Sequence, residues 1–396
     1  MKNTSQILIG TIGLLCASAW TSTANAQDAM PAAMPMPMPL PVPAMSGPLS
    51  GNPKPTSFDA GPIGNVYVTG VASGMFQWQD AIFPGDKESQ VDLTNGQVFI
   101  SKTDGLLQFF VQVGIYSLPD LGLPYVRANN IPGATWGAMP QAFIKIAPND
   151  SFSILAGKLP TLIGAEYTFS FENMNIQRGL LWNQENAVNR GVQVNYTLGP
   201  IALAASWNDG FYSNQFSWLW GSVAWTIDGS NAISFVGGGN LIHTNTATFA
   251  TPLALNNESI FNIIYTYTDG PLTIQPYFQY TNVPKIASIG ILHSASTTGG
   301  ALLVKYSFTD NFALAGRVEY ISSTGSLANG APSLIYGPGS NAWSFTVTPT
   351  YQQGIYFIRG EYSYVSASST TPGFAMGPNF TDKTENRLLV ETGVIF

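Results

Sequence analysis

The feature that most constrains the fold is a two-residue alternation of apolar and polar side chains, repeated in segments of about ten residues. In NFALAGRVEY, residues 311–320, every second residue is apolar or glycine, and the residues between them include Arg317 and Glu319. Successive side chains of a strand point to opposite faces, so one face is apolar and the other polar. WSFTVTPTY (343–351) and GIYFIRGEYSY (354–364) repeat the pattern. Such a series of strands is typical of a transmembrane β-barrel.

The connections between these segments alternate in length. Seven short ones, most with the Gly, Asp, Asn or Pro of tight hairpins, fall at 101–105, 147–150, 198–200, 227–230, 268–271, 308–311 and 352–354. Longer ones lie near 80–89, 117–134, 160–186, 209–215, 243–255, 283–296, 322–340 and 366–384. The pattern predicts an all-β fold over residues 58–396: a transmembrane antiparallel β-barrel of about 16 strands (about 14–18), with short periplasmic turns and long external loops.

The first 26 residues predict export from the cell's interior. Lys2 precedes an apolar run from Ile7 to Trp20, and Ala24-Asn25-Ala26 supplies a small-residue cleavage site, so residues 1–26 read as a cleaved signal peptide. The single cysteine, Cys16, lies within it, which leaves no thiol in the expected mature chain. Residues 27–57 are rich in Pro and Met and are expected to form a disordered or semi-rigid leader. A spacer is favoured over a segment that binds the cell wall or a partner.

Composition narrows the expected location. Only 9% of the residues are charged and 12% are aromatic, whereas about a quarter of a soluble domain is charged. After the expected cleavage site, the sequence has no apolar run long enough for a spanning helix. An exported, charge-poor chain of alternating strands is therefore expected in the outer membrane of a Gram-negative bacterium, surrounded by outer-membrane lipid and lipopolysaccharide.

Charged residues in the last predicted strands define a candidate pore wall. A Lys or Arg that faces lipid at mid-bilayer costs about 2–4 kcal/mol, so these charges are expected to face the lumen. The predicted pore-lining residues are Lys305, Arg317, Glu319, Arg359, Glu361, Arg387 and Glu391. A mixture of both signs favours weak ion selectivity. The alternative is a salt-bridged plug that stiffens the barrel without contacting a solute.

The longest predicted loop, residues 160–186, is the candidate constriction. An inward fold would narrow the channel, and an ordinary external loop is the alternative. The candidate constriction residues are Glu166, Glu172, Arg178 and Glu185. Lys158 and Arg190 are placed at strand ends near the rim. Inward Gly, Ala, Ser and Thr predict an open bore, whereas inward aromatic residues would block it, and these are Trp218, Trp220, Tyr277 and Phe357.

The final segment, RLLVETGVIF (387–396), reads as the strand that closes the barrel. Leu388, Val390, Val394 and Phe396 share one face. Phe396 resembles the carboxy-terminal signature of outer-membrane proteins, so it is predicted to be an assembly signal recognised by the barrel-assembly machinery. An interface aromatic with no signalling role is the alternative.

Two segments carry a family resemblance. FSILAGKLPTLIGAEYTFS (152–170) and NAVNRGVQVNYTLGPIALAASWNDG (186–210) resemble the OmpL-like β-barrel porin family in their order of strand, Gly157-Lys158, Gly164 with Glu166, a long irregular segment, and a strand opening with Gly191. The His that often precedes this last Gly in the family is replaced here by Asn189-Arg190. The resemblance implies a channel and does not name its solute.

No enzyme, cofactor, metal site or nucleic-acid partner is expected. The two histidines, His243 and His293, fall in predicted loops, and neither a nucleophile motif nor metal-ligand spacing is present. The predicted function is a weakly ion-selective porin for passive diffusion of small hydrophilic solutes. The alternative is a non-conducting surface or adhesion protein with ligand-binding external loops. The pattern leaves open whether the chain is monomeric or a homo-oligomer.

Overall fold

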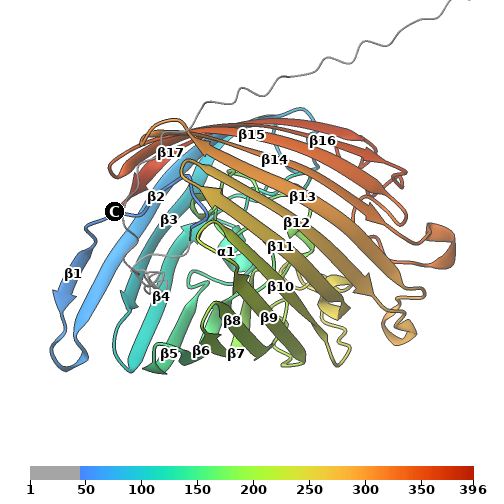
Figure 1. Cartoon of the computed structure of the whole chain (residues 1–396). Coiled ribbons are helices and arrows are strands. Elements are labelled where there is room, and N and C mark those ends of the chain that lie inside the picture. Colours follow the sequence, from blue (N-terminus) through green and yellow to red (C-terminus); the bar gives the residue numbers. More distant parts are fainter. Residues whose placement is uncertain (1–44) are drawn as a thin grey trace, which may run out of the picture. The chain divides into compact units, whose positions relative to one another are not determined.

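The computed structural model describes residues 45–396. Strands β2 to β17 form one antiparallel ring in which each strand pairs with its sequence neighbours and β17 pairs with β2, closing the barrel (Figure 1). This confirms the predicted sixteen-strand β-barrel. The expected signal peptide (1–26), with Cys16, and residues 27–44 of the expected leader lie outside the described residues.

The ring strands are β2 (Asn65–Gln79), β3 (Ser89–Lys102), β4 (Leu107–Tyr116), β5 (Ala142–Asn149), β6 (Phe152–Pro160), β7 (Val188–Leu198), β8 (Ile201–Asn208), β9 (Trp218–Thr226), β10 (Asn231–Asn240), β11 (Ser259–Asp269), β12 (Leu272–Val283), β13 (Ala295–Ser307), β14 (Phe312–Ser323), β15 (Asn341–Gln353), β16 (Tyr356–Ser368) and β17 (Thr384–Ile395). The strand β1 (Thr56–Asp59) pairs with the start of β2. Helix is limited in the described part to α1 (Ile131–Ala134) and short 3₁₀ turns at Gly61–Ile63, Ser170–Glu172, Trp182–Gln184, Leu255–Asn257, Ala287–Ile289 and Leu327–Asn329.

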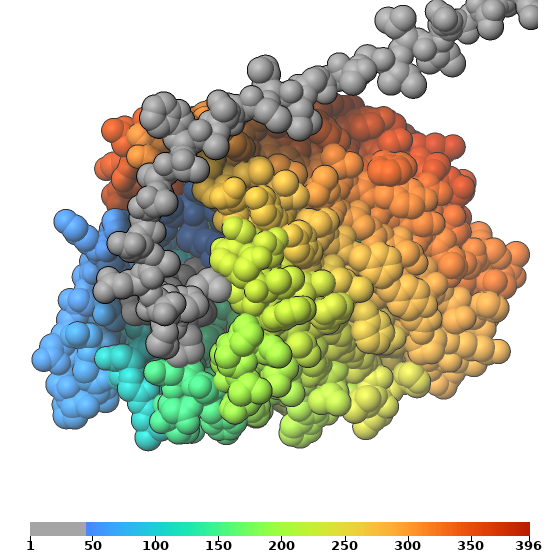
Figure 2. Space-filling view, viewed as in Figure 1, coloured from blue at the N-terminus to red at the C-terminus, as the bar shows by residue number. Residues whose placement is uncertain are grey.

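The two faces of the sheet follow the predicted alternation. In β14, Val318 is 43% exposed on the outer face, whereas its neighbours Arg317 and Glu319 are buried on the inner face. The strand register places outward apolar side chains beside one another, since Val318 pairs with Phe345 of β15. In the space-filling view, strands β10 to β14 form a continuous outer wall (Figure 2). No helix among residues 45–396 is long and apolar enough to cross a membrane.

Connections alternate as the turn chemistry predicted. Short turns follow β3, β5, β7, β9, β11, β13 and β15, and longer loops follow the even-numbered strands from β2 to β16. All short turns therefore lie at one end of the barrel, called here the short-turn end, and the long loops at the other. The general rule for outer-membrane barrels predicts that the short-turn end is periplasmic.

The expected leader is not a free spacer where the structure describes it. Leu49 is 3% exposed in an apolar cluster with Phe357 and Ile395, and Ser50 hydrogen-bonds the Gln352 side chain. Thr56–Asp59 forms β1. These partners lie about 300 positions away in sequence, so local Pro/Met composition does not reveal them.

The seam between the first and last strands extends to the final residue. The Gly70 N–H donates to the Phe396 carbonyl oxygen at 2.8 Å, and the Phe396 N–H donates to the Gly70 carbonyl oxygen at 2.9 Å. The Phe396 ring lies so close to Gly70 that an added Cβ would be 2.4 Å from the ring atom Cζ. Glycine at position 70 therefore makes room for the terminal aromatic ring.

Replacing Gly70 with alanine is expected to lower the yield of closed, heat-modifiable barrel. The new Cβ would also lie 2.8 Å from the Gln97 carbonyl oxygen, a backbone atom that cannot move aside without disturbing β3. Gly360→Ala is the matched control, because its Cβ would have Pro349 Cγ at 3.7 Å as nearest neighbour. The measurement is the folded fraction on an unheated gel, and equal fractions for both variants would contradict the expected steric conflict.

Candidate functional site

A long connection between β6 and β7 fills much of the barrel interior. We call residues 161–187 the inserted loop. Every residue from Thr168 to Ala187 is buried except Asn183, which is half-buried. Its contacts reach the inner face across the ring, because Asn95 of β3 donates to Ser170 and Gln279 of β12 donates to the Leu181 carbonyl oxygen. The loop expected to fold inward thus lies inside the barrel.

Glutamates of the late strands hold the inserted loop by its backbone. Glu361 accepts the N–H groups of Ile176 and Gln177. Glu319 accepts those of Leu180 and Leu181, at 3.1 and 3.3 Å. A carboxylate that accepts N–H bonds satisfies donors that would otherwise be buried without partners, which costs about 1–3 kcal/mol for each donor. These glutamates therefore dock a loop that forms no strand and whose β-pairing, in the described chain, is limited to an isolated bridge between Arg178 and Asp120.

Three arginines of the late strands form ion pairs with carboxylates and donate hydrogen bonds to backbone carbonyl oxygens inside the barrel. Arg317 forms ion pairs with Glu166 of the inserted loop and Glu319. Arg359 pairs with Glu391 and donates to the Ser170 and Asn173 carbonyl oxygens at 2.9 and 3.1 Å. Arg387 pairs with Glu385 and donates to the Asp120 carbonyl oxygen at 2.7 Å. We call these three arginines with Glu319, Glu361 and Glu391 the charged wall.

The structure places all seven predicted pore-lining residues on the inner face, but in two settings. The six charged-wall side chains are at most 3% exposed, because they contact the inserted loop and, at Arg387, also Asp120 and Leu123 of the β4–β5 connection. Lys305 alone among the seven is half-buried, near the short-turn end. The charged-wall residues were expected to border a water-filled path. Their side chains instead contact loop residues, and this arrangement corresponds to the salt-bridged plug considered from the sequence.

The four candidate constriction residues also lie inside the barrel, with exposures of 5% or less. Arg178 pairs with Asp120 and lies 4.9 Å from the centre of the Trp182 ring. Glu172 accepts the Phe169 N–H at 2.9 Å, and burial raises its pKa to about 8. Burial likewise raises the pKa of Glu166 to about 7 despite its arginine partner. The site is therefore rich in carboxyl groups that are costly to ionise.

Two glutamates lack the partners that the others have. Within residues 45–396, neither carboxyl oxygen of Glu185 or Glu258 has a hydrogen-bond partner. Burial raises the pKa of both well above the usual range, and the neighbouring Glu185 raises that of Glu258 further. Sequence reasoning missed Glu258, which lies just before β11 and beyond the predicted long connection 243–255, with no local signal of burial.

Glycines in the inserted loop were also missed as functional positions. An added Cβ at Gly179 would lie 2.1 Å from a Glu319 carboxyl oxygen, and one at Gly164 would lie 1.8 Å from a Glu185 carboxyl oxygen. The carboxyl groups of Glu319 and Glu185 thus occupy the space that a side chain at Gly179 or Gly164 would need. Glycines in a long irregular segment, Gly164 of the family resemblance and Gly179 directly after Arg178, were the available signal of a close approach.

The inner face opposite the charged wall is reached by water. Inward positions on the short-turn half of β7 to β12 are partly exposed, and all of them are uncharged and most are small or hydroxyl-bearing: Gln193, Asn195, Ala204, Ser222, Ala224, Ser234, Thr266 and Gln275. Register aligns them, since Ser222 pairs with Ala204 of β8 and Ala224 pairs with Ser234 of β10. We call this surface the neutral wall.

An aromatic cluster closes the long-loop end of the neutral wall. Trp218 stacks on Trp220 with ring centres 5.2 Å apart, and Phe211 meets Trp218 edge-on. Ile163 of the inserted loop and Ile260 pack against them. Both tryptophans, with Tyr277 and Phe357, are the inward aromatics predicted to fill a bore, and all four are buried. Inward side chains of β9 to β12 are therefore partly exposed toward the short-turn end and buried toward the long-loop end.

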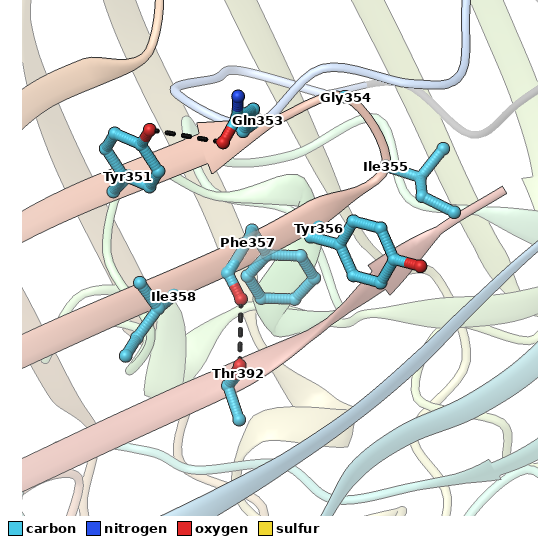
Figure 3. A pocket seen from close by; sticks show the side chains of 8 residues that line it. All are labelled: Tyr351, Gln353, Gly354, Ile355, Tyr356, Phe357, Ile358 and Thr392. Carbon is cyan, nitrogen blue, oxygen red and sulfur yellow. Dashed lines mark hydrogen bonds between the residues drawn. The ribbon is translucent and has the colours of Figure 1, made fainter.

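Two further features lie outside the lumen. Lys158 donates to the carbonyl oxygens of Trp136 and Met139, and Arg190 pairs with Asp209 near the rim. A hollow on the outer face lies at the β15–β16 turn (Figure 3). Its lining is largely apolar and aromatic: Tyr351, Gln353, Gly354, Ile355, Tyr356, Phe357, Ile358 and Thr392. Among residues 45–396, no group of three or more His, Cys, Asp or Glu side chains could hold a metal ion.

A closed barrel with an apolar outer face and a polar, loop-filled interior is an outer-membrane β-barrel of the porin class. The chain belongs to the family described as "Putative beta-barrel porin-2, OmpL-like", whose model matches residues 65–396. The family resemblance seen in the sequence is thereby confirmed. No curated protein sequence matches the chain.

Solved structures agree on the fold. OmpT expressed in the outer membrane of Vibrio cholerae is 13% identical, with a TM-score of 0.56 over 87% of this chain and 100% of that one. The outer-membrane channel DcaP of Acinetobacter baumannii is 10% identical, with a TM-score of 0.56 over 84% and 97%. OmpF of Salmonella typhi, in complex with daunomycin, is 12% identical, with a TM-score of 0.55 over 84% and 98%.

Proposed function

We propose that this protein is an outer-membrane porin for passive diffusion of small hydrophilic solutes, whose path follows the neutral wall. The observation that supports this most directly is the partly exposed, uncharged inner surface of β7 to β12. Amides, hydroxyls and alanine carry no fixed charge, so weak ion selectivity follows. The reason differs from the one suggested by the sequence, which relied on a balance of opposite charges.

A charged label on the neutral wall tests the path. Ser222→Cys, treated with a charged, membrane-impermeant thiol reagent in a planar bilayer, is expected to lose about half or more of its conductance, since a fixed charge in a narrow pore changes ion passage. Val223→Cys is the matched control, because this neighbouring side chain is 42% exposed on the outer face. Labelled Ser222→Cys with unchanged conductance would place the path elsewhere.

One observation favours the second candidate, a non-conducting surface protein. The aromatic cluster and the inserted loop bury the inward residues of the long-loop half of β9 to β12, among them Trp218, Trp220 and Ile260. Complete absence of conductance from folded, bilayer-inserted protein would favour this function over the porin.

The partners follow from the membrane setting. We propose contact with outer-membrane lipid and lipopolysaccharide, and recognition of Phe396 by the barrel-assembly machinery. We also propose a homo-oligomer, since β5 and β8 have only eight residues each. At about 3.3 Å per residue and a tilt of about 45°, such a strand rises about 19 Å, less than the apolar band of about 25 Å. A second copy packed against the short strands β5 and β8 would cover them where their height falls short of the apolar band.

The oligomer is tested by the protein mass in detergent micelles. A mass of two or more chains is expected for the wild type. Ile144 is 54% exposed on the outer face of β5, and Ile144→Glu is expected to shift the mass to that of one chain. Ile358→Glu, on the outer face of β16 where Ile358 is 48% exposed, should leave the oligomer intact. A single-chain mass for the wild type would refute the proposal.

A further inference from the structure

The segment before β1 enters the barrel through the short-turn end. We call residues 45–54 the strap. The Ser50 N–H donates to the Gln352 side-chain oxygen at 2.8 Å, and the Gln352 side-chain amide donates to the Ser50 carbonyl oxygen at 2.9 Å. Gln352 lies at the end of β15, beside a short turn. A single amide side chain thus fixes the strap to the rim in the manner of a strand partner.

Farther inside, the strap contacts both the barrel and the inserted loop. Leu49 is 3% exposed in a cluster that includes Phe99, Phe357 and Phe171 of the inserted loop. The Ser46 N–H and hydroxyl both donate to the Glu172 carbonyl oxygen, at 2.8 and 3.0 Å. The same few residues therefore connect a turn at the barrel rim to the centre of the inserted loop.

The contacts that join the strap to the barrel and the inserted loop, called here the joint, are of kinds that can form and break reversibly. Residues 45–54 include one charged side chain, Lys54, which is exposed, and the strap forms no ion pair with the rest of the described chain. Ser50 is itself exposed, so the rim contact is reached by water from the short-turn end. The joint rests on two apolar side chains, buried Leu49 and half-buried Met45, and on neutral hydrogen bonds. The charged wall holds the inserted loop by charged groups instead, among them Arg359, which donates to the Ser170 and Asn173 carbonyl oxygens on either side of Glu172.

From this geometry we infer that the strap is an autoinhibitory contact: docked, it holds the inserted loop in the lumen from the periplasmic side, and undocked, it lets the loop shift and widens the path. The inference rests on the proposed porin function. Regulation then acts at the short-turn end, where the strap enters the barrel, and not at the external loops. A periplasmic force or partner acting on the amino-terminal segment would then change conductance.

Crosslinking the strap tests the inference. The expected mature chain has no cysteine, so Ser50→Cys with Gln352→Cys introduces the only thiol pair. Bilayer conductance is measured before and after reduction, with each single variant as control and the crosslink scored on a non-reducing gel. We expect several-fold lower open-state occupancy in the oxidised double variant than after reduction. A formed crosslink with equal conductance in both states would overturn the inference.

Deletions supply the second measurement, independent of disulfide geometry. Removing residues 27–54 is expected to raise the mean conductance several-fold, whereas removing only residues 27–44 leaves the strap in place and should not. Heat-modifiable migration shows that each variant is folded. If both deletions conduct like the full chain, the strap has no regulatory role although the porin function stands. If no folded variant conducts, the porin function fails and the inference with it.

Discussion

Replacing Arg317 with methionine is expected to destabilise the folded protein by about 3–5 kcal/mol, because it leaves two buried carboxylates without their counter-charge. Arg317 is 1% exposed and pairs with Glu166 and Glu319. It also donates to the Gln177 carbonyl oxygen at 2.8 Å. The same substitution should free the inserted loop, since Glu166 and Gln177 both belong to that loop.

Two measurements check this result. Denaturant unfolding in detergent micelles gives the change in the free energy of unfolding, and limited proteolysis of the still-folded barrel reports release of residues 161–187. Lys305→Met is the matched control on the same inner face, since Lys305 is half-buried and forms no ion pair within residues 45–396. Its effect should be small. If both variants unfold at the wild-type midpoint, the charged wall does not anchor the loop.

Stability should fall as pH rises, and replacing Glu185 and Glu258 with glutamine should remove much of this fall. The folded-state pKa of both carboxyl groups is raised well above the usual range by burial. Below the unfolded pKa of about 4.3, both states keep the protons and there is no penalty. Above it the unfolded chain releases protons that the folded chain retains, so the free energy of unfolding falls until the raised folded pKa is passed.

The size of the effect follows from linkage. Each pH unit between the two pKa values costs about 1.36 kcal/mol per group. The unfolding midpoint of wild type and double variant is measured at several pH values between acid and weakly alkaline conditions. Glutamine does not titrate, so the double variant should show a flatter profile, whatever its absolute stability. Glu88→Gln alters an exposed loop glutamate and should keep the wild-type slope. An unaltered slope in the double variant would contradict the buried, protonated state.

The barrel was predictable because its determinants are local. Alternation within ten residues fixed which side of β14 faces inward, so Arg317 and Glu319 were placed on the correct face. Tight-turn residues fixed where strands end. What covers those charges was not predictable, because Glu361 contacts Ile176 and Gln177 across about 185 positions of sequence. No periodicity records such a contact.

Composition was also an incomplete guide where a polar or flexible segment finds a distant partner. Residues 45–57 read as a Pro/Met spacer, yet Leu49 is buried among side chains from both ends of the chain. The inward aromatics Trp218 and Trp220 were found from parity alone, but only the structure shows that they gather at one end of the lumen, while inward residues toward the other end are partly exposed.

In β9 the inner and outer faces carry different side chains, so residues of the inner face can be replaced without replacing those of the outer face. Ser222 and Ala224 face the lumen, whereas Val223 and Trp225 between them are 42% and 47% exposed on the outer wall. A substitution at an inner position therefore leaves the side chains of the outer face unchanged. Under the proposed porin function, substitutions along the neutral wall are therefore expected to change solute preference while the outer face of the barrel stays the same.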